Sequence, residues 1–230
     1  MSRRNKLQKF AEILTFPNVY ENFTNFPPQL TGMGGKEVDL KGKWNAEHFK
    51  NDQPITLELA CGRGEYTVAL AQKYPNRNFI GVDIKGARIW KGARIALEKK
   101  LKNAAFLRTR IELITAFFEL EEIDEIWITF PDPFLKKGKT NRRLTSPRFL
   151  NLYRQILKKE GLVHLKTDEG VLSEYTLEVL AEDKQTKILY QDDDIYAKPL
   201  PMDELEIKTY YEKMHLEKGK TIKYIRFTIN

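Results

Sequence analysis

The chain passes from an apolar strand into a helix within the stretch Leu57-Glu58-Leu59-Ala60-Cys61-Gly62-Arg63-Gly64-Glu65. Gly62 and Gly64 allow the backbone to turn tightly and to approach a bound molecule closely. The helix predicted to follow, Glu65–Tyr74, directs its N-terminus at the same place. Because a Gly-x-Gly pair also occurs in ordinary turns, its meaning depends on the elements around this junction.

Strands and helices alternate along the rest of the chain. Apolar runs predict strands at Ile55–Leu59, Phe79–Ile84, Ala104–Leu107, Glu125–Phe130, Leu162–Lys166, Lys187–Tyr190 and Lys223–Thr228. Helices are predicted at Lys6–Leu14, Glu65–Tyr74, Gly86–Leu101, Glu112–Phe118, Ser146–Lys159 and Glu169–Glu182, the fifth with Ser146 as its N-cap and Gly161 at its end. This order is typical of an α/β fold with a doubly wound, mostly parallel sheet, and the last two strands predict an antiparallel hairpin at one edge.

The first fifty residues differ in composition from the rest. They contain Pro17, Pro27, Pro28, a glycine-rich stretch at Thr31–Gly35 and scattered aromatic residues. We therefore predict a basic, irregular N-terminal arm at 1–50, which begins with a short helix, and one α/β domain at 51–230.

Composition narrows the class of protein. The 230 residues carry a formal charge of +7 and the pI is about 9.2, which favours nucleic acid or another anionic partner. Cys61 is the single cysteine, so an internal disulfide is excluded and a reducing compartment is favoured. Without a signal peptide or a membrane-length apolar run, the sequence indicates a cytoplasmic protein. His48, His164 and His215 lack ligand-like spacing, so no metal site is expected.

The residues around the glycine turn indicate which nucleotide it binds. Asp83 follows the turn by about twenty residues, at the end of the second strand, where an acid can accept bonds from ribose hydroxyls. Thr67 stands where a dinucleotide fingerprint needs Gly or Ala, and no phosphate-binding P-loop motif occurs. Glu58 adds negative charge, which suits a ligand with an ammonium and a sulfonium group. S-adenosylmethionine carries both and a ribose, and we expect a side chain at Gly64 to block its binding while the fold stays intact.

A second notable stretch follows the apolar strand Ile126–Phe130. Asp132 stands between Pro131 and Pro133, and proline restricts both its own backbone and that of the preceding residue. A rigidly held acid at the carboxyl end of a strand is where open α/β sheets place their chemistry. The basic side chains that follow point to a polyanionic substrate; they are Lys136, Lys137, Lys139, Arg142 and Arg143.

These motifs together resemble the bacterial tRNA (guanine-N7)-methyltransferase family, from about residue 50 to the C-terminus. The resemblance rests on Glu58-x-x-x-Gly62-x-Gly64, Gly81-Val82-Asp83, Phe130-Pro131-Asp132-Pro133, Lys166-Thr167-Asp168 and Thr209-Tyr210-Tyr211-Glu212. It implies a Rossmann-like class I methyltransferase with a seven-stranded sheet. The implied reaction is methyl transfer from S-adenosylmethionine to N7 of the variable-loop guanine at tRNA position 46.

The resemblance also assigns roles by position. It implies cofactor contacts by Glu58, Gly62, Gly64, Asp83 and Asp132, and Asp132 is expected to be the catalytic residue. Arg110 is also expected to contact the cofactor, although the family usually has an acid at this place near the adenine. Phe134 stands where the family commonly has Trp. Substrate and RNA contacts are implied for Lys136, Lys139, Arg142, Arg143, Asp168, Thr209 and Glu212.

The chemistry of guanine explains how few groups the reaction needs. N7 carries an in-plane lone pair and no proton, so the reaction needs no general base. Catalysis is expected to rest on the alignment of N7 with the methyl group of the cofactor. Asp132 is expected to stabilise the charge that grows on the base. Glu212, alone or with Asp168, is our candidate for accepting bonds from the Watson–Crick edge of guanine, with Thr209 capping or orienting it.

Three other functions remain open at this point. A methyltransferase for exocyclic amines would carry paired prolines after the acid, whereas Asp132 has a single proline on each side. A nicotinamide dehydrogenase is disfavoured by Glu58 and Thr67. A non-catalytic RNA-binding protein with a vestigial cofactor fold would have no affinity for S-adenosylmethionine. The sequence favours neither a monomer nor a homodimer.

Overall fold

The computed structural model describes residues 5–24 and 26–230. Its internal contacts divide the chain into two compact units, Met1–Glu119 and Leu120–Asn230, and each is described by itself. The charged start of the chain, Met1–Arg4, lies outside the described residues. The boundary predicted at residue 50 stays a prediction.

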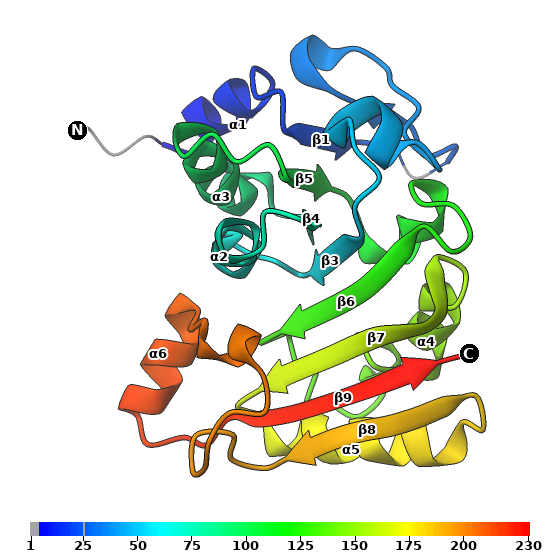
Figure 1. The fold of residues 1–230 in the computed structure, drawn as a ribbon, viewed down its shortest axis with the longest axis vertical. Coiled ribbons are helices and arrows are strands. Elements are labelled where there is room, and N and C mark those ends of the chain that lie inside the picture. Colours follow the sequence, from blue (N-terminus) through cyan, green and yellow to red (C-terminus); the bar gives the residue numbers. More distant parts are fainter. Residues whose placement is uncertain (1–4, 25) are drawn as a thin grey trace. The chain divides into compact units, whose positions relative to one another are not determined.

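The first unit is built on a mostly parallel sheet with the strand order β2-β1-β5-β4-β3 (Figure 1). Strands β3, β4 and β5 are buried almost throughout, as expected for central parallel strands that are covered on both faces. The elements are α1 (Lys6–Ile13), β1 (Val19–Asn22), β2 (Leu30–Thr31), the short helices η1 (Met33–Gly35) and η2 (Trp44–Phe49), β3 (Ile55–Leu59), α2 (Glu65–Lys73), β4 (Asn78–Asp83), α3 (Gly86–Glu98), β5 (Ala104–Arg108) and the 3-10 helix η3 (Ile111–Ala116).

The predicted irregular arm contributes two strands, and this part of the prediction was wrong. Strand β1 runs parallel to β5, with Val19 opposite Phe106, and β2 pairs antiparallel with β1. Trp44 is completely buried, and its indole N–H donates to the Phe117 carbonyl at 2.9 Å. These strands are too short to give a clear period in the sequence, and their partner β5 lies far along the chain. The described residues therefore form nine strands, where seven were expected.

The second unit contains a four-stranded mixed arrangement in the order β6-β7-β9-β8. Strands β6 and β7 are parallel, whereas β9 runs antiparallel to both β7 and β8, which confirms the antiparallel edge predicted for the last two strands. The elements are β6 (Ile123–Thr129), η4 (Thr140–Arg142), α4 (Pro147–Tyr153), β7 (Leu157–Thr167), α5 (Gly170–Glu182), β8 (Thr186–Asp192), η5 (Asp203–Glu206), α6 (Tyr210–Glu217) and β9 (Lys223–Ile229).

Helix α4 is shorter than predicted, because the chain returns to the sheet earlier. It ends at Tyr153, and Leu157 already pairs with Ile123 of β6. The register then jumps to Glu125 opposite Leu162, so the extra residues of β7 bulge outward and Glu160 adopts a left-handed φ of 62°. Gly161 therefore lies within the strand. Ser146 occupies the N-cap position, but its hydroxyl donates to the Asn141 carbonyl and does not cap the helix.

Helix α6 was not predicted. Its first turn is a capping box, in which the Thr209 hydroxyl accepts from the Glu212 N–H and the Glu212 carboxylate accepts from the Thr209 N–H. The Thr-x-x-Glu spacing that signals such a cap is present in the sequence. From the sequence, these residues are assigned to a substrate motif with Thr209 capping or orienting Glu212, and the structure shows that they also begin a helix.

Candidate functional site

The turn after β3 has a strongly left-handed backbone. Ala60, Gly62 and Gly64 have φ angles of 56°, 57° and 65°, and the Gly64 N–H donates to the Cys61 carbonyl at 2.8 Å. Ala60 carries a Cβ, and this conformation costs such a residue about 1–2 kcal/mol. Strain of this kind persists only where the surrounding structure holds it, and it is found preferentially at ligand sites.

Asp83, at the end of β4, holds this turn in place. One carboxylate oxygen accepts from the Gly62 N–H at 2.9 Å, and the other accepts from the Lys85 N–H at 2.7 Å. The residue is only 7% exposed. The structure thus brings together Gly62 and Asp83, which the sequence assigned to one pocket. Each carboxylate oxygen has two lone pairs, so these two bonds do not exhaust its acceptors.

Glu58 is buried in β3 and is bonded to helix α2. Its carboxylate accepts from the Thr67 N–H at 2.8 Å and from the Thr67 hydroxyl. Thr67, which in the sequence served only to exclude a dinucleotide fingerprint, therefore anchors the first turn of α2. Burial, together with the Glu58 and Asp83 carboxylates, raises the pKa of the Cys61 thiol. The turn is thus flanked by two acids and contains a thiol that stays protonated.

The two glycines of the turn have different surroundings. A Cβ on Gly64 would lie 2.4 Å from Phe106 Cε1 and 3.3 Å from the Cα of Gly92 in α3. A Cβ on Gly62 would meet only the Ala60 carbonyl oxygen, at 4.0 Å. Gly64 is therefore required for packing, and the expectation that a side chain there would leave the fold intact needs correction. Gly62 is the glycine that faces open space.

Arg110 lies two residues after β5, and its guanidinium is largely in solvent. The side chain is 53% exposed and lies 3.7 Å from the Glu112 carboxylate. The preceding Thr109 is buried, and its hydroxyl accepts from the Asn22 side chain of β1 at 3.2 Å. The expected contact of Arg110 with the cofactor stays a prediction.

Asp132, in the second unit, lies in a constrained turn directly after β6. The neighbouring Phe130 and Phe134 have left-handed φ angles of 50° and 43°. One carboxylate oxygen of Asp132 accepts from the Phe134 N–H at 3.0 Å, and the residue is exposed. The backbone around Asp132 is constrained, as the flanking prolines predicted, and the structure adds that the acid is in contact with solvent.

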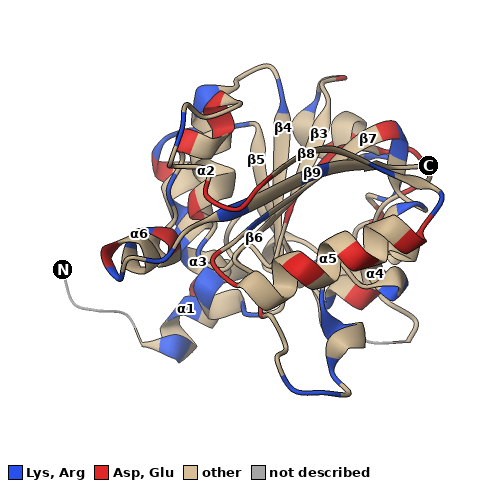
Figure 2. Ribbon diagram, turned by 90° about the horizontal axis from the view of Figure 1, so that it is seen from below, with Lys and Arg blue, Asp and Glu red and all other residues tan. Residues whose placement is uncertain are grey.

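The cationic loop after this turn contains two kinds of residue. Lys136, Lys139 and Arg142 are exposed, and this loop appears with several blue segments in Figure 2. Arg143 is 4% exposed; its Nε donates to the Pro133 carbonyl at 2.9 Å, and its guanidinium lies 4.4 Å from the centre of the Tyr175 ring. Arg143 therefore anchors the Pro-Asp-Pro turn to α5, a role that the run of basic letters does not reveal.

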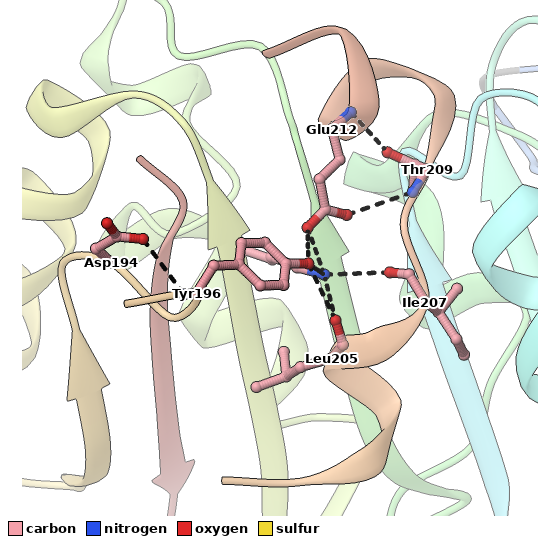
Figure 3. A network of polar contacts seen from close by, with 7 residues as sticks. Asp194, Tyr196, Leu205, Ile207, Thr209 and Glu212 are labelled. Carbon is pink, nitrogen blue, oxygen red and sulfur yellow. Dashed lines mark hydrogen bonds and ion pairs between the residues drawn. The ribbon is translucent and has the colours of Figure 1, made fainter. Parts of the chain in front are cut away.

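Glu212 occupies the centre of a buried network (Figure 3). Its side chain exposes none of its surface and pairs with Lys166 of β7 at 2.7 Å, while Tyr196 donates its hydroxyl to the same carboxylate. Burial, with the Glu212 carboxylate as a further cause, raises the pKa of Tyr196, so this hydroxyl keeps its proton. Burial lowers the pKa of Lys166, and the charge of Glu212 opposes that shift. The sequence did not identify Lys166 or Tyr196 as partners of the Thr209–Glu212 motif.

Asp168, two residues beyond Lys166, pairs with the last turn of α6 and with the segment that follows it. Its carboxylate contacts the Lys220 ammonium and lies 3.2 Å from His215 Nδ1. His215 also stacks on Phe130 with a centroid distance of 6.1 Å. In the second unit, the residues predicted to contact substrate therefore lie on the turn after β6, at the end of β7 and on α6.

Neither a metal cluster nor a membrane span was found in the described part of the chain. No group of three or more His, Cys, Asp and Glu side chains among residues 5–24 and 26–230 is arranged to hold a metal ion. No helix formed by these residues is long and apolar enough to cross a membrane.

Comparison with known sequences shows similarity over the full length. The family model described as "Putative methyltransferase" matches residues 52–225. The chain is 49% identical over 230 residues to a tRNA (guanine-N(7)-)-methyltransferase of Christiangramia forsetii, and the alignment covers all of both chains. It is 47% identical over 226 residues to a protein of the same name from Bacteroides thetaiotaomicron, covering 98% of this chain and 86% of the relative.

Solved structures with the same fold are more distant in sequence. The 16S rRNA (adenine(1408)-N(1))-methyltransferase of Catenulisporales acidiphilia, solved with the cosubstrate SAM, matches with a TM-score of 0.59 and 17% identity. The match covers 84% of this chain and 93% of that chain. At this identity the likeness shows the fold alone, and it confirms the predicted α/β class.

Proposed function

Because this chain belongs to the tRNA (guanine-N7)-methyltransferase family, we propose that it methylates N7 of the variable-loop guanine at tRNA position 46. The observation that carries this proposal is the identity of nearly half the residues over the whole length of a relative with this activity in its name. The cofactor of the family is S-adenosylmethionine, and the enzyme would work in the cytoplasm, where its tRNA substrate is found.

The turn after β3 fits this cofactor. A Cβ added at Gly62 would meet no atom closer than the Ala60 carbonyl oxygen at 4.0 Å, so the backbone here leaves room for a ligand. Asp83 would accept bonds from the ribose hydroxyls, and the negative charge of Glu58 and Asp83 suits a cationic ligand. S-adenosylmethionine, when bound, supplies a methyl group on a positively charged sulfur.

The second unit would supply the contacts to the base and to the tRNA backbone. Guanine N7 attacks through its lone pair, so no side chain has to remove a proton. Asp132 would stabilise the positive charge that develops on the ring, because its carboxylate is held in place before the reaction. Lys136, Lys139 and Arg142 would bind phosphates, while Arg143 keeps the Asp132 turn in position.

One assay tests the function directly. The protein is incubated with radiolabelled S-adenosylmethionine and unmodified tRNA, and the nucleosides are then separated. Label in 7-methylguanosine is expected, and a tRNA with adenine at position 46 should remain unlabelled. Label in another nucleoside, or equal labelling of the two tRNAs, would reject the proposed site of methylation. Absence of any label would leave a binding protein as the alternative.

Gly62→Ala is expected to weaken cofactor binding by about tenfold or more with little change in packing. The added methyl would occupy the open space beside the turn, where the ligand is expected. Gly34→Ala is the matched control, because Gly34 has a similar φ of 72° and no atom within 4 Å of its Cβ position. Both variants carry the same backbone cost of about 1–2 kcal/mol. Calorimetry measures the affinity of each variant for S-adenosylmethionine. Equal affinities in the two variants would show that the cofactor does not bind beside Gly62.

Replacing Lys136, Lys139 and Arg142 together with alanine should weaken tRNA binding and flatten its salt dependence. Each phosphate contact that is lost reduces the slope of log affinity against log salt by roughly one, so a change of about 2–3 is expected. Filter binding at several salt concentrations measures the slope. The control is a triple alanine variant of Lys159, Lys184 and Lys187, which are exposed lysines of the same unit. If the slope of log affinity against log salt is the same in the Lys136, Lys139 and Arg142 variant as in wild type, this loop does not contact the tRNA phosphates.

A further inference from the structure

Lys166 is a charged side chain with no exposed surface, and its ammonium contacts groups between Tyr196 and Glu212. Its ammonium lies 2.7 Å from the Glu212 carboxylate and donates to the Leu205 and Ile207 carbonyls at 3.2 Å each. It also donates to the Tyr196 hydroxyl at 3.3 Å. A single ammonium at the end of β7 thus ties down the chain from η5 to the first turn of α6.

Glu212 completes this arrangement from the other side. One carboxylate oxygen accepts from Lys166 and from Tyr196, and the other accepts from the Thr209 N–H at 3.3 Å (Figure 3). The Tyr196 hydroxyl also lies 3.1 Å from the Leu205 carbonyl, which joins the loop after β8 to the same centre. The carboxylate is consequently engaged on both oxygens and sealed from solvent.

We propose that Lys166, Tyr196 and Glu212 form a buried latch that positions Thr209 and the start of α6 for methyl transfer, so that Glu212 acts as a positioning residue and does not itself contact guanine. This inference rests on the proposed function, because it assigns a role within the same reaction. It replaces the expectation that Glu212 reads the base edge. The Thr-x-x-Glu motif then serves as a helix cap joined to the sheet by an ion pair.

The cost of breaking a buried ion pair favours this role. If Glu212 turned toward a base, Lys166 would be left buried without its counterion, which is strongly unfavourable whether it keeps or loses its proton. Asp168 is in a different situation, because its partner Lys220 is 44% exposed and can be hydrated when it is released. Asp168 therefore remains the acid that can exchange an internal partner for the amine edge of guanine, whereas the latch stays closed.

A double-mutant cycle on the full-length protein tests the latch. Lys166→Met, Glu212→Gln and the combined variant are compared in single-turnover methylation at saturating tRNA and cofactor. Each single variant should be slower by about 10- to 100-fold, since a misplacement near 1 Å is enough for such a loss. The combined variant should be no slower than the slower single variant, because both changes break one interaction. Affinity for S-adenosylmethionine should stay within about twofold of wild type.

Lys158→Met is the matched control. Lys158 lies in the same strand and pairs with Asp124 at 2.6 Å, but its side chain is 49% exposed. Its methylation rate should stay close to wild type, since exposed pairs contribute little. Amide hydrogen exchange over residues 205–217 gives a readout independent of catalysis, and faster exchange is expected in the latch variants alone.

The rates of these variants distinguish the latch from direct contact between Glu212 and the base. A slow Glu212→Gln beside a wild-type rate in Lys166→Met would show that Glu212 contacts the base itself and overturn the latch. Rate losses that multiply in the combined variant would do the same. If Lys166→Met does not fold, Tyr196→Phe removes one hydroxyl from the centre, and unchanged rate and exchange there would also reject the proposal. A wild-type protein without methylation would reject the proposed function, and hydrogen exchange would still report whether the latch holds α6.

Discussion

Asp132→Asn should lower the rate of methyl transfer by about 10²–10³, by analogy with the loss of other preorganised electrostatic partners. Asparagine retains an oxygen that can accept the Phe134 N–H, so the turn after β6 is expected to keep its shape. Only the negative charge is lost, and with it the stabilisation of the charge that grows on guanine. Single-turnover methylation with bound tRNA and cofactor is the measurement that isolates this step.

The pH dependence and a control variant sharpen this prediction. Since guanine N7 carries no proton to remove, the residual activity of Asp132→Asn should vary little with pH across the neutral range. Asp193→Asn, which changes another exposed carboxylate of the same unit, should react at the wild-type rate. A rate for Asp132→Asn within about threefold of wild type would exclude the carboxylate from the charge-stabilising role.

Gly64→Val should destabilise the first unit severely. The new Cβ would lie 2.4 Å from Phe106 Cε1 and 2.9 Å from Phe106 Cζ, and the two γ-methyl groups would add to the overlap. Overpacking costs about 1–3 kcal/mol, and a left-handed backbone at a branched residue adds about 1–2 kcal/mol, so the free energy of unfolding should fall by about 2–5 kcal/mol. Denaturant unfolding measures the loss.

Variants of Gly62 and Gly64 are expected to affect different properties, cofactor affinity for Gly62 and stability for Gly64. Gly62→Ala should retain most of its stability and lose cofactor affinity, whereas Gly64→Val should lose stability whether or not cofactor is present. A second variant, Phe106→Ala combined with Gly64→Val, would remove the ring that the valine meets. If the free-energy losses of the two single changes add fully in the combined variant, the clash with Phe106 is not the cause.

The sequence predicted best where the information is local. Strands β3, β4 and β5 are apolar runs bounded by turn residues, and they were identified to within a residue or two. The joining of Gly62 to Asp83 was expected from the rule that the carboxyl ends of neighbouring parallel strands share one edge. The restricted backbone around Asp132 was expected from the two prolines, because proline restricts the backbone whatever its surroundings.

The predictions failed where a segment takes its conformation from a distant partner. Strand β1 exists because β5 offers it hydrogen bonds, and nothing in its four residues reveals that. Helix α4 stops early because Ile156 and Leu157 are buried on return to the sheet. The Thr-x-x-Glu spacing of the α6 capping box is present in the sequence, but the same two residues match a substrate motif, so the sequence alone does not separate the two roles.

By itself the sequence determined the α/β class, the glycine turn with its acids, the Pro-Asp-Pro turn and the resemblance to a methyltransferase family. These features depend on periodicity and on backbone restrictions that act over a few residues. Only the tertiary structure decided which charges are exposed. Arg143 and Glu212 look like their solvated neighbours in the sequence, yet the first holds a turn and the second is paired with Lys166 inside the protein. Burial of a charge depends on a partner brought from elsewhere in the chain, and only the folded arrangement specifies that partner.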